Sequence, residues 1–337
     1  MDKTHLLQGL AKLKGRPINQ AQCTEMPGGA SSRRYFRVML ENCSWVVMVL
    51  ADDPLKSEEA SNETVTTELP FLTIQSYLAD ADVSVPKIHL YDQSLGQVWL
   101  DDLGDVTLLE KLATGQVTEL YRNAIDLLIQ FQQAMASPPA DFIACQRRFE
   151  ASLLIWELEH YVEWRVQEQL QRTPSAEDAA LLPGLFEELV SSLQQQPQVV
   201  CHRDYQSTNI MHTQNRLVLI DFQDALMGPY AYDLVALLRD SYVQLESTQV
   251  DALIDYYLES RRDLNPDEFR SAFDYQTVQR KLKDAGRFVY IDRVKNDPRY
   301  LKWVDSTLDY VRLALARRPE LNKLNDCLKR LDPEAFE

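Results

Sequence analysis

The sequence has little cysteine and no long hydrophobic run. Its five cysteines are scattered along 337 residues without a Cys-x-x-Cys pair, which favours reduced thiols in a cytosolic protein over a disulfide framework. The most apolar stretch, residues 45–51, is far shorter than a membrane span, and the N-terminus holds no apolar segment of signal-peptide length. We therefore expect a cytoplasmic protein that does not cross a membrane.

Several signatures of common enzyme classes are also missing. The chain contains no Gly-x-x-x-x-Gly-Lys-Ser/Thr, Gly-x-Gly-x-x-Gly, Gly-x-Ser-x-Gly or His-Glu-x-x-His motif. Its five histidines show no zinc-ligand spacing with the cysteines. Any catalytic site must therefore be built from other residues.

Basic residues are the minority among the charges. There are 35 of them against 51 acidic residues, which gives a net charge of −16. Such a surface repels nucleic-acid backbones, so we expect no nucleic-acid partner. A local site with a metal ion can still bind one small phosphate compound. The length predicts two domains, or one domain with a large insertion.

The first hundred residues are predicted to form a small sheet-rich unit. Aromatic and β-branched residues on both sides of the polar segment Glu41–Ser44 indicate a hairpin over residues 35–50. Further elements are expected as a helix over 58–79, broken near Pro70, and strands over 87–91 and 97–101.

After residue 104 the pattern becomes helical. Hydrophobic residues recur every three to four positions, which predicts amphipathic helices. We expect helices over 116–136, 149–171, 232–243, 250–260 and 308–316, with one short strand over 216–222. The fold class is therefore α+β, with an N-terminal lobe of residues 1–103 and a mainly helical C-terminal lobe of residues 104–337.

Residues 199–224 carry the densest chemical signal. His202-Arg203-Asp204 is followed by Asn209, and Asp221 comes at the end of an apolar strand twelve residues later. This spacing lets the Asp204 carboxylate face an acceptor hydroxyl while the Asn209 amide and the Asp221 carboxylate bind Mg²⁺. Phosphoryl transfer needs an oriented hydroxyl, a metal ion at the phosphates and fixed geometry. The structural alternative is that these residues cap a helix and satisfy turns. Residue type, spacing and context together favour the catalytic interpretation.

Further segments match a known pattern in the same order. The matching text comprises residues 33–37, 46–48, 101–105, 202–209, 220–225, 228–229 and 232–240. With these motifs the chain resembles the protein-kinase-like superfamily, in its aminoglycoside and choline phosphotransferase branch. More narrowly, it resembles the bacterial anomeric kinases of N-acetylmuramate and N-acetylglucosamine. The resemblance implies a two-lobed kinase fold with ATP as co-substrate and Mg²⁺ as cofactor.

The resemblance also implies roles for single residues. Asp204 would orient or deprotonate the sugar hydroxyl, and Asn209 and Asp221 would hold Mg²⁺. Asp233 would brace the catalytic loop by accepting backbone hydrogen bonds, and His202 would support the same loop. An anomeric hydroxyl is more acidic than an ordinary alcohol, so Asp204 would position it more than deprotonate it.

The N-terminal lobe fits this resemblance with one departure. Small residues before the first strand of the hairpin let the backbone approach phosphates closely, although an ordinary turn has the same composition. The residues concerned are Gly28, Gly29, Ser31 and Ser32.

Related kinases carry a phosphate-binding lysine on the next strand, where this chain has Met48. Arg34 is one substitute, because strand alternation places it on the same face as Phe36 and Val38. It points towards the nucleotide only if that face covers the adenine, and a solvated arginine is the alternative.

Recognition of the acceptor is the part least determined by the sequence. Glu157 and Arg239 are our candidates for hydrogen bonds to the sugar. Trp156, His160 and Trp164 are spaced four apart and form an aromatic stripe, which more often packs a core than binds a sugar. A basic group would suit the lactyl carboxylate of N-acetylmuramate.

We therefore expect a monomeric kinase for a small-molecule amino sugar, acting at its C1 hydroxyl in peptidoglycan recycling. An aminoglycoside phosphotransferase and a choline- or homoserine-type kinase are alternatives with the same fold. A pseudokinase that binds nucleotide and scaffolds partners is the alternative of another class, which the missing lysine favours and the intact Asp204, Asn209 and Asp221 oppose.

Overall fold

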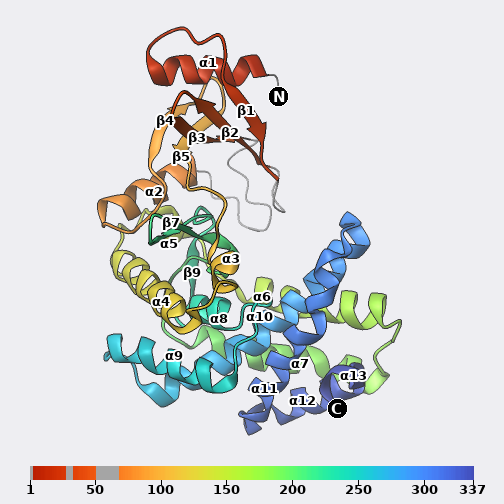
Figure 1. Cartoon of the computed structure of the whole chain (residues 1–337). Coiled ribbons are helices and arrows are strands. Elements are labelled where there is room, and N and C mark those ends of the chain that lie inside the picture. The colour runs from red at the N-terminus through yellow and green to blue at the C-terminus, as the bar shows by residue number, and fades with distance from the viewer. Residues whose placement is uncertain (1–2, 28–32, 51–67) are drawn as a thin grey trace.

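The computed structural model describes residues 3–27, 33–50 and 68–337. A narrow lobe built on a β-sheet sits above a wider helical body, and the chain passes from the first to the second without returning (Figure 1). The predicted fold class, α+β with a small sheet-rich N-terminal lobe and a larger, mainly helical C-terminal lobe, is confirmed. The expected boundary at residues 103/104 falls just after the last strand of the sheet.

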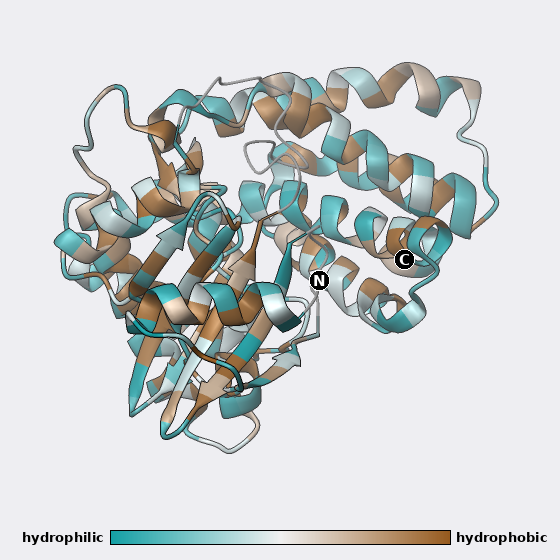
Figure 2. Cartoon of the chain, turned by 90° about the horizontal axis from the view of Figure 1, so that it is seen from above, coloured by the Kyte–Doolittle hydropathy of each residue, from teal (hydrophilic) through white to brown (hydrophobic). Residues whose placement is uncertain are grey.

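The N-terminal lobe is an antiparallel sheet of five strands in the order β1-β2-β3-β5-β4. Hydrophobic and hydrophilic residues alternate along its strands (Figure 2), as expected when each face meets a different environment. The strands are β1 (Gln22–Glu25), β2 (Arg34–Leu40), β3 (Cys43–Val49), β4 (Ile88–Asp92) and β5 (Gln97–Asp101).

The predicted hairpin over residues 35–50 is present, with a shorter turn than the polar segment suggested. Leu40 pairs with Cys43 in the ladder, which leaves only Glu41 and Asn42 as the connection. Glu41 has a φ of 55°, the left-handed backbone that tight two-residue hairpin turns require. The strands over 87–91 and 97–101 are confirmed as β4 and β5.

A helix covers each face of this sheet. Helix α1 (Lys3–Lys14), which the sequence analysis did not predict, packs Leu6 and Leu10 onto the face that carries Phe36 and Val38. Helix α2 (Pro70–Asp80) packs onto the opposite face, in the core cluster that contains Met48. Since that cluster continues into the C-terminal lobe, the face of Met48 is the one turned towards that lobe, and we call it the cleft face.

Helix α2 begins at Pro70, where proline is well suited to the first turn because its missing N–H has no partner there. The expected helix start at residue 58 lies outside the described residues.

The C-terminal lobe is mostly helical, as predicted. Its longer helices are α4 (Val117–Ala134), α6 (Ala151–Tyr161) with its π-helical continuation η1 (Val162–Gln169), α7 (Ala176–Gln194), α8 (Tyr232–Leu238), α9 (Ser247–Ser260), α10 (Pro266–Lys295), α11 (Val304–Ala316) and α12 (Asn322–Leu331). Short helices are α3 (Leu108–Leu112), α5 (Ile143–Gln146), η2 (Ser207–Asn209), η3 (Pro298–Trp303), η4 (Pro319–Leu321) and α13 (Pro333–Phe336).

Two small antiparallel sheets lie among these helices, where the sequence predicted one strand. β6 (Gln198–Cys201) pairs with β9 (Leu226–Pro229), and β7 (Ile210–Thr213) pairs with β8 (Arg216–Leu219). The predicted strand over 216–222 stops early, because Asp221 adopts a left-handed φ of 65°.

Helix α8 also ends before the predicted Val243. The Asp240 carboxylate accepts hydrogen bonds from the backbone N–H groups of Ser207 and Tyr242, which turns the chain out of the helix.

Helix α10 is the central element of this lobe, and no hydrophobic stripe predicted it. It packs against α6, α8 and α11, and it buries polar side chains along much of its length, including Gln276, Gln279, Arg280, Lys281 and Asp284. Because polar and apolar side chains are buried together around this helix, its hydrophobic period is weak, and sequence analysis relies on that period. Within the described parts of the chain, no helix combines the length and hydrophobicity needed to cross a membrane.

Gly286 marks the closest approach between α10 and α6. A Cβ atom at this position would lie 2.8 Å from the carbonyl oxygen of His160 and from the Cα of Tyr161. These are backbone atoms of a packed helix, so they have little freedom to move aside.

We expect Gly286→Ala to lower the free energy of unfolding by about 1–3 kcal/mol, because the added methyl group forces the two helices apart. Gly184→Ala on α7 is the matched control, since no atom lies within 4 Å of its Cβ position. That control should raise stability by about 0.5–1 kcal/mol, because alanine is the better helix former. Chemical unfolding of both variants checks this, and equal effects would contradict the close packing.

Candidate active site

The segment between β6 and β7, residues 202–209, is a loop held by buried acceptors from helix α8 and the chain just beyond it. We call it the catalytic loop. Asp233, at the start of α8, accepts hydrogen bonds from the backbone N–H groups of His202 (2.7 Å) and Arg203 (3.0 Å). Burial raises the pKa of Asp233, although the nearby His202 and these two N–H groups oppose the shift. The expected bracing contacts of Asp233 are thus present, and Asp240 holds Ser207 further along the same loop.

His202 ties the loop to the next strand. Its Nε2 lies 2.9 Å from the carbonyl oxygen of Ile220, and its ring meets Phe131 and Tyr205 edge to face. Burial lowers the pKa of His202, which favours the neutral imidazole. The side chain therefore supports the loop next to Asp221.

Arg280 of helix α10 fixes the loop from the other side. Its guanidinium donates from Nη1 to the carbonyl oxygen of Arg203 at 2.8 Å and lies 3.4 Å from Oδ1 of Asp204 through Nη2. The side chain is fully buried and packs over the ring of Tyr232, 4.7 Å from its centroid. Arg203 has a φ of 81°, so its backbone bends the chain where Arg280 holds it.

Asp204 presents its carboxylate to the cleft, with 41% of the side chain exposed. Burial of its surroundings alone would raise the pKa of Asp204, but the positive charges of Arg280, Lys283 and Arg203 outweigh this and hold the pKa below its ordinary value. The group is therefore an ionised acceptor for a hydroxyl and a weak base.

Asn209 and Asp221 are brought together next to Asp204. Asn209 donates through Nδ2 to the backbone oxygen of Asp204 at 2.9 Å, which leaves its Oδ1 as a free acceptor. The backbone oxygen of Asn209 accepts from the N–H of Ile220 at 3.1 Å, so Asp221 follows directly beside it. The three residues predicted from spacing therefore share one place in the fold.

The surroundings of Asp221 suit a bound cation. Its Oδ1 accepts a hydrogen bond from Nε2 of Gln223 at 2.8 Å, which leaves Oδ2 available. Burial and the charges of Asp204 and Asp224 raise the pKa of Asp221. A carboxylate crowded by other carboxylates, beside an amide oxygen, is a donor set that fits a hard ion such as Mg²⁺.

No group of three His, Cys, Asp or Glu side chains that could cage a metal occurs among the described residues. An Asn–Asp pair completed by water and phosphate oxygens needs no such cage.

The sheet contributes Arg33 and Tyr35 to the cleft. Arg33 hydrogen-bonds the Tyr35 hydroxyl, and the charges of both Arg33 and Asp221 act on that hydroxyl. Burial, followed by the charge of Asp221, raises the pKa of Tyr35 to about 12. The Tyr35 hydroxyl also lies 3.6 Å from the Sδ atom of Met48. The cleft face of the sheet therefore carries Arg33.

The expected placement of Arg34 is wrong. Arg34 lies on the face that α1 covers, where it pairs with Glu25 at 2.8 Å and packs over the ring of Phe36. Strand alternation was read correctly, but the unpredicted helix α1 occupies the face assigned to the nucleotide. Gly28, Gly29, Ser31 and Ser32 lie outside the described residues.

A pocket opens between helices α6 and α10. It is lined by Leu153, Trp156, Glu157, His160, Lys283 and Arg287. Glu157 is buried and its Oε2 accepts a hydrogen bond from Nε2 of Gln279 at 2.7 Å. Trp156 is 49% exposed, so the aromatic stripe is only partly core packing.

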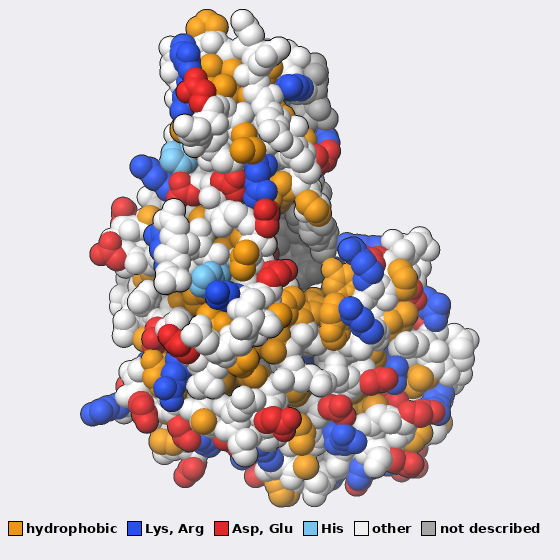
Figure 3. All heavy atoms as spheres, in the orientation of Figure 1, with side chains coloured by type: hydrophobic (Ala, Val, Ile, Leu, Met, Phe, Trp, Pro, Cys, Tyr) orange, Lys and Arg blue, Asp and Glu red, His pale blue; other side chains and the backbone are white. Residues whose placement is uncertain are grey.

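In Figure 3, hydrophobic side chains gather on the face below the sheet lobe, and Lys and Arg side chains flank them beside the projecting end of the helical body.

Arg239 does not line this pocket. It is 1% exposed, and its guanidinium lies between the rings of Phe273 and Tyr310, 5.7 Å and 5.2 Å from their centroids. Its position at the end of α8 turns it into the packing of α10 and α11, so its expected contact with an acceptor is wrong.

The residues that sequence reasoning missed are Arg280, Lys283 and Arg287 on α10. Their spacing of three and four is the spacing of one helix face, which is a signal that could have found them. The helix itself was not predicted, so the pattern had no element to belong to.

The chain is similar in sequence to known phosphotransferases and sugar kinases. The sequence model of the phosphotransferase enzyme family matches residues 22–271. The N-acetylmuramate/N-acetylglucosamine kinase of Pseudomonas aeruginosa is 34% identical over 320 residues, covering 93% of this chain and 90% of that protein. The protein of the same name from Pseudomonas putida is 33% identical over 318 residues, covering 93% and 89%.

A solved structure with the same fold is the GDP complex of aminoglycoside 2′-phosphotransferase-IIIa. Its TM-score is 0.61 at 16% identity, and the match covers 94% of this chain and 99% of that one. At this identity the likeness concerns the fold.

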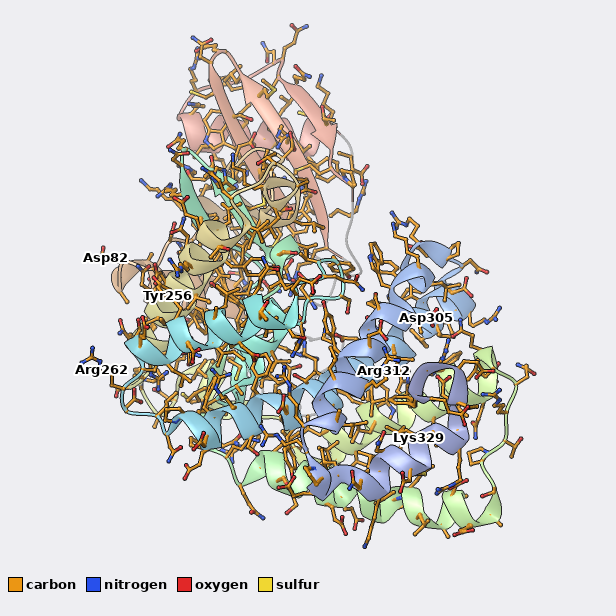
Figure 4. All side chains as sticks on the ribbon, turned by 60° about the horizontal axis from the view of Figure 1, so that its bottom comes forward. Asp82, Tyr256, Arg262, Asp305, Arg312 and Lys329 are labelled. Carbon is orange, nitrogen blue, oxygen red and sulfur yellow. The ribbon has the colours of Figure 1, made fainter. Side chains whose placement is uncertain are left out.

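We expect Arg280→Met to lower the free energy of unfolding by about 2–3 kcal/mol, because it leaves a buried carbonyl unsatisfied and nearby carboxylates without their counter-charge. Arg312→Met is the matched control. Arg312, labelled in Figure 4, is exposed on α11 and pairs only with exposed Asp309 among the ion pairs of the described residues. It should change stability by less than about 1 kcal/mol. Urea unfolding distinguishes the two, and a small effect at Arg280 would mean that the loop does not depend on it.

Proposed function

This chain belongs to the phosphotransferase enzyme family, and from that premise we propose that it transfers the γ-phosphoryl group of ATP to the C1 hydroxyl of N-acetylmuramate or N-acetylglucosamine. The observation that carries the proposal is the position of Asp204. Its ionised carboxylate faces the cleft with Asn209 and Asp221 beside it, and Lys283, whose charge acts on it, also lines the pocket of α6 and α10.

In the proposed reaction the acceptor hydroxyl donates a hydrogen bond to Asp204, which aims its oxygen at the γ-phosphorus. A new oxygen–phosphorus bond forms as the bond between the γ-phosphorus and the β,γ-bridging oxygen breaks, and ADP leaves. The hydroxyl proton passes to Asp204 or to the phosphoryl oxygens. Because the pKa of Asp204 is low, the carboxylate orients more than it deprotonates, which suits the relatively acidic anomeric hydroxyl.

Asn209 and Asp221 would hold Mg²⁺, which would supply positive charge against the charge that develops on the transferred phosphoryl group. The nucleotide would bind to the cleft face of the lobe of residues 1–103, and the acceptor to the lobe of residues 104–337. The proposed setting is a cytoplasmic, monomeric enzyme of peptidoglycan recycling.

The pocket supports an amino sugar over the rival acceptors. Lys283 and Arg287 make it locally basic on a chain whose net charge is −16. Aminoglycosides and choline are cations, which these side chains would repel. The exposed face of Trp156 offers a flat apolar surface, and Glu157 offers an acceptor for sugar hydroxyls.

The test is ATP consumption with N-acetylmuramate, N-acetylglucosamine, an aminoglycoside and choline as acceptors, followed by phosphorus NMR of the product. We expect turnover with the amino sugars alone and an acid-labile phosphate at C1. Asp204→Asn should lower kcat by about 100-fold or more, since it removes the group that orients the hydroxyl, while nucleotide affinity remains. Undiminished turnover in that variant would refute the mechanism. Nucleotide binding without ADP release for any acceptor would instead favour a scaffold.

A second expectation concerns Arg33, which we propose as the phosphate-binding cation in place of the lysine absent at Met48. We expect Arg33→Gln to raise the KM for ATP by about tenfold or more, because Arg33 lies on the cleft face and its charge reaches Asp221. Arg34→Gln is the matched control on the neighbouring residue, and its KM should stay within about twofold. Initial rates at varied ATP decide between them. A larger effect at Arg34 would contradict the assignment of the faces.

A further inference from the structure

The pocket between α6 and α10 carries two cations on one face of one helix. Lys283 and Arg287 are four residues apart on α10, so they lie about one helical turn, or roughly 5–6 Å, from each other. Both line the pocket, together with Glu157, Trp156 and His160 of α6. Paired cations at this separation can share one carboxylate group.

The acidic side chains next to Lys283 and Arg287 also contact other residues. Oδ1 of Asp284 lies 3.7 Å from Nζ of Lys283, and Oδ2 of the same carboxylate lies 2.7 Å from Nζ of Lys281. On α6, the Oε2 of Glu157 accepts the hydrogen bond from Gln279.

His160 and Arg287 also contact residues outside the pocket lining. His160 lies 3.8 Å from Glu163, and Arg287 packs over the ring of Tyr290 at 4.8 Å. The pocket is therefore a locally positive site on an acidic protein.

The pocket is also connected to the reacting centre. Arg280 of α10 lies 3.4 Å from Asp204, and Lys283, about one turn further along the same helix, lines the pocket and adds its charge at Asp204. Arg287 lies one turn further along α10, away from Arg280 and the catalytic loop. A ligand whose hydroxyl meets Asp204 can thus carry an anionic group towards Arg287.

The two sugars of the proposed function differ in one such group. N-Acetylmuramate carries a lactyl ether with a carboxylate on its third ring carbon, and N-acetylglucosamine has a hydroxyl there. The lactyl arm is removed from C1 by the carbon that bears the acetamido group. Arg287, one helical turn beyond Lys283 on the side away from Asp204, is placed to meet the lactyl carboxylate.

We propose that Lys283 and Arg287 form a carboxylate-binding subsite that recognises the lactyl group of N-acetylmuramate, with Arg287 as the main specificity-determining residue. This inference rests on the proposed function. A planar guanidinium can bind a carboxylate through two parallel hydrogen bonds, and Lys283 adds a second charge nearer the sugar ring.

The experiment compares kcat/KM for N-acetylmuramate, its methyl ester and N-acetylglucosamine in the wild-type protein and in Arg287→Gln. For the wild type we expect the free acid to be favoured over the neutral ester by about tenfold or more. In Arg287→Gln the ratio of kcat/KM for the acid to that for the ester should fall towards one. Lys283→Gln should lower the same ratio by a smaller factor, and Arg287→Lys should restore part of it.

Arg312→Gln is the charge-matched control, since it removes one exposed cation on α11 and should leave all three rates as they are. Melting temperatures of all variants identify any that fail to fold, and the acid–ester comparison in the wild type stands without them.

Equal use of acid and ester by the wild type, or an equal loss for all acceptors in Arg287→Gln, would overturn the subsite. If wild-type protein phosphorylates N-acetylglucosamine but not N-acetylmuramate, the subsite fails while the kinase function survives. If it phosphorylates neither, both fail.

Discussion

The buried guanidinium of Arg280 is the contact on which the site depends. It reaches from the long helix α10 to the backbone of Arg203 and the carboxylate of Asp204, so one side chain ties this helix to the catalytic loop. The same helix presents Lys283 and Arg287 to that pocket. Since Gly286 brings α10 against the backbone of α6, the distance between pocket and loop is set by helix packing rather than by a mobile connection.

Negative and positive side chains occupy different parts of the cleft. Carboxylates gather where a cation and phosphates would lie, at Asp204, Asp221 and Asp224, and cations flank them from the sheet and from α10. The backbone around them is equally constrained, because Asp233 and Asp240 hold the loop by its N–H groups. A chain with strongly negative net charge can therefore offer a local surface that attracts anions.

The sequence was most informative where the site is contiguous. Asp204, Asn209 and Asp221 lie on one loop and one hairpin, so spacing alone predicted that they meet. Prediction failed where tertiary packing decides, as for Arg34, whose face is covered by a helix that the apolar pattern did not reveal. Likewise, α10 buries polar residues together with apolar ones, so its hydrophobic stripe is too weak to predict the helix. The sequence also did not show that Arg239 lies outside the pocket, because this depends on its burial between two aromatic rings.

The crowding of Asp204, Asp221 and Asp224 affects more than chemistry. Burial and the negative charges of Asp204 and Asp224 raise the pKa of Asp221, so keeping Asp221 ionised in the folded chain costs free energy. A ligand that relieves it stabilises the folded state in proportion to its free concentration. Molecules without a ligand therefore open more often and meet cellular proteases sooner.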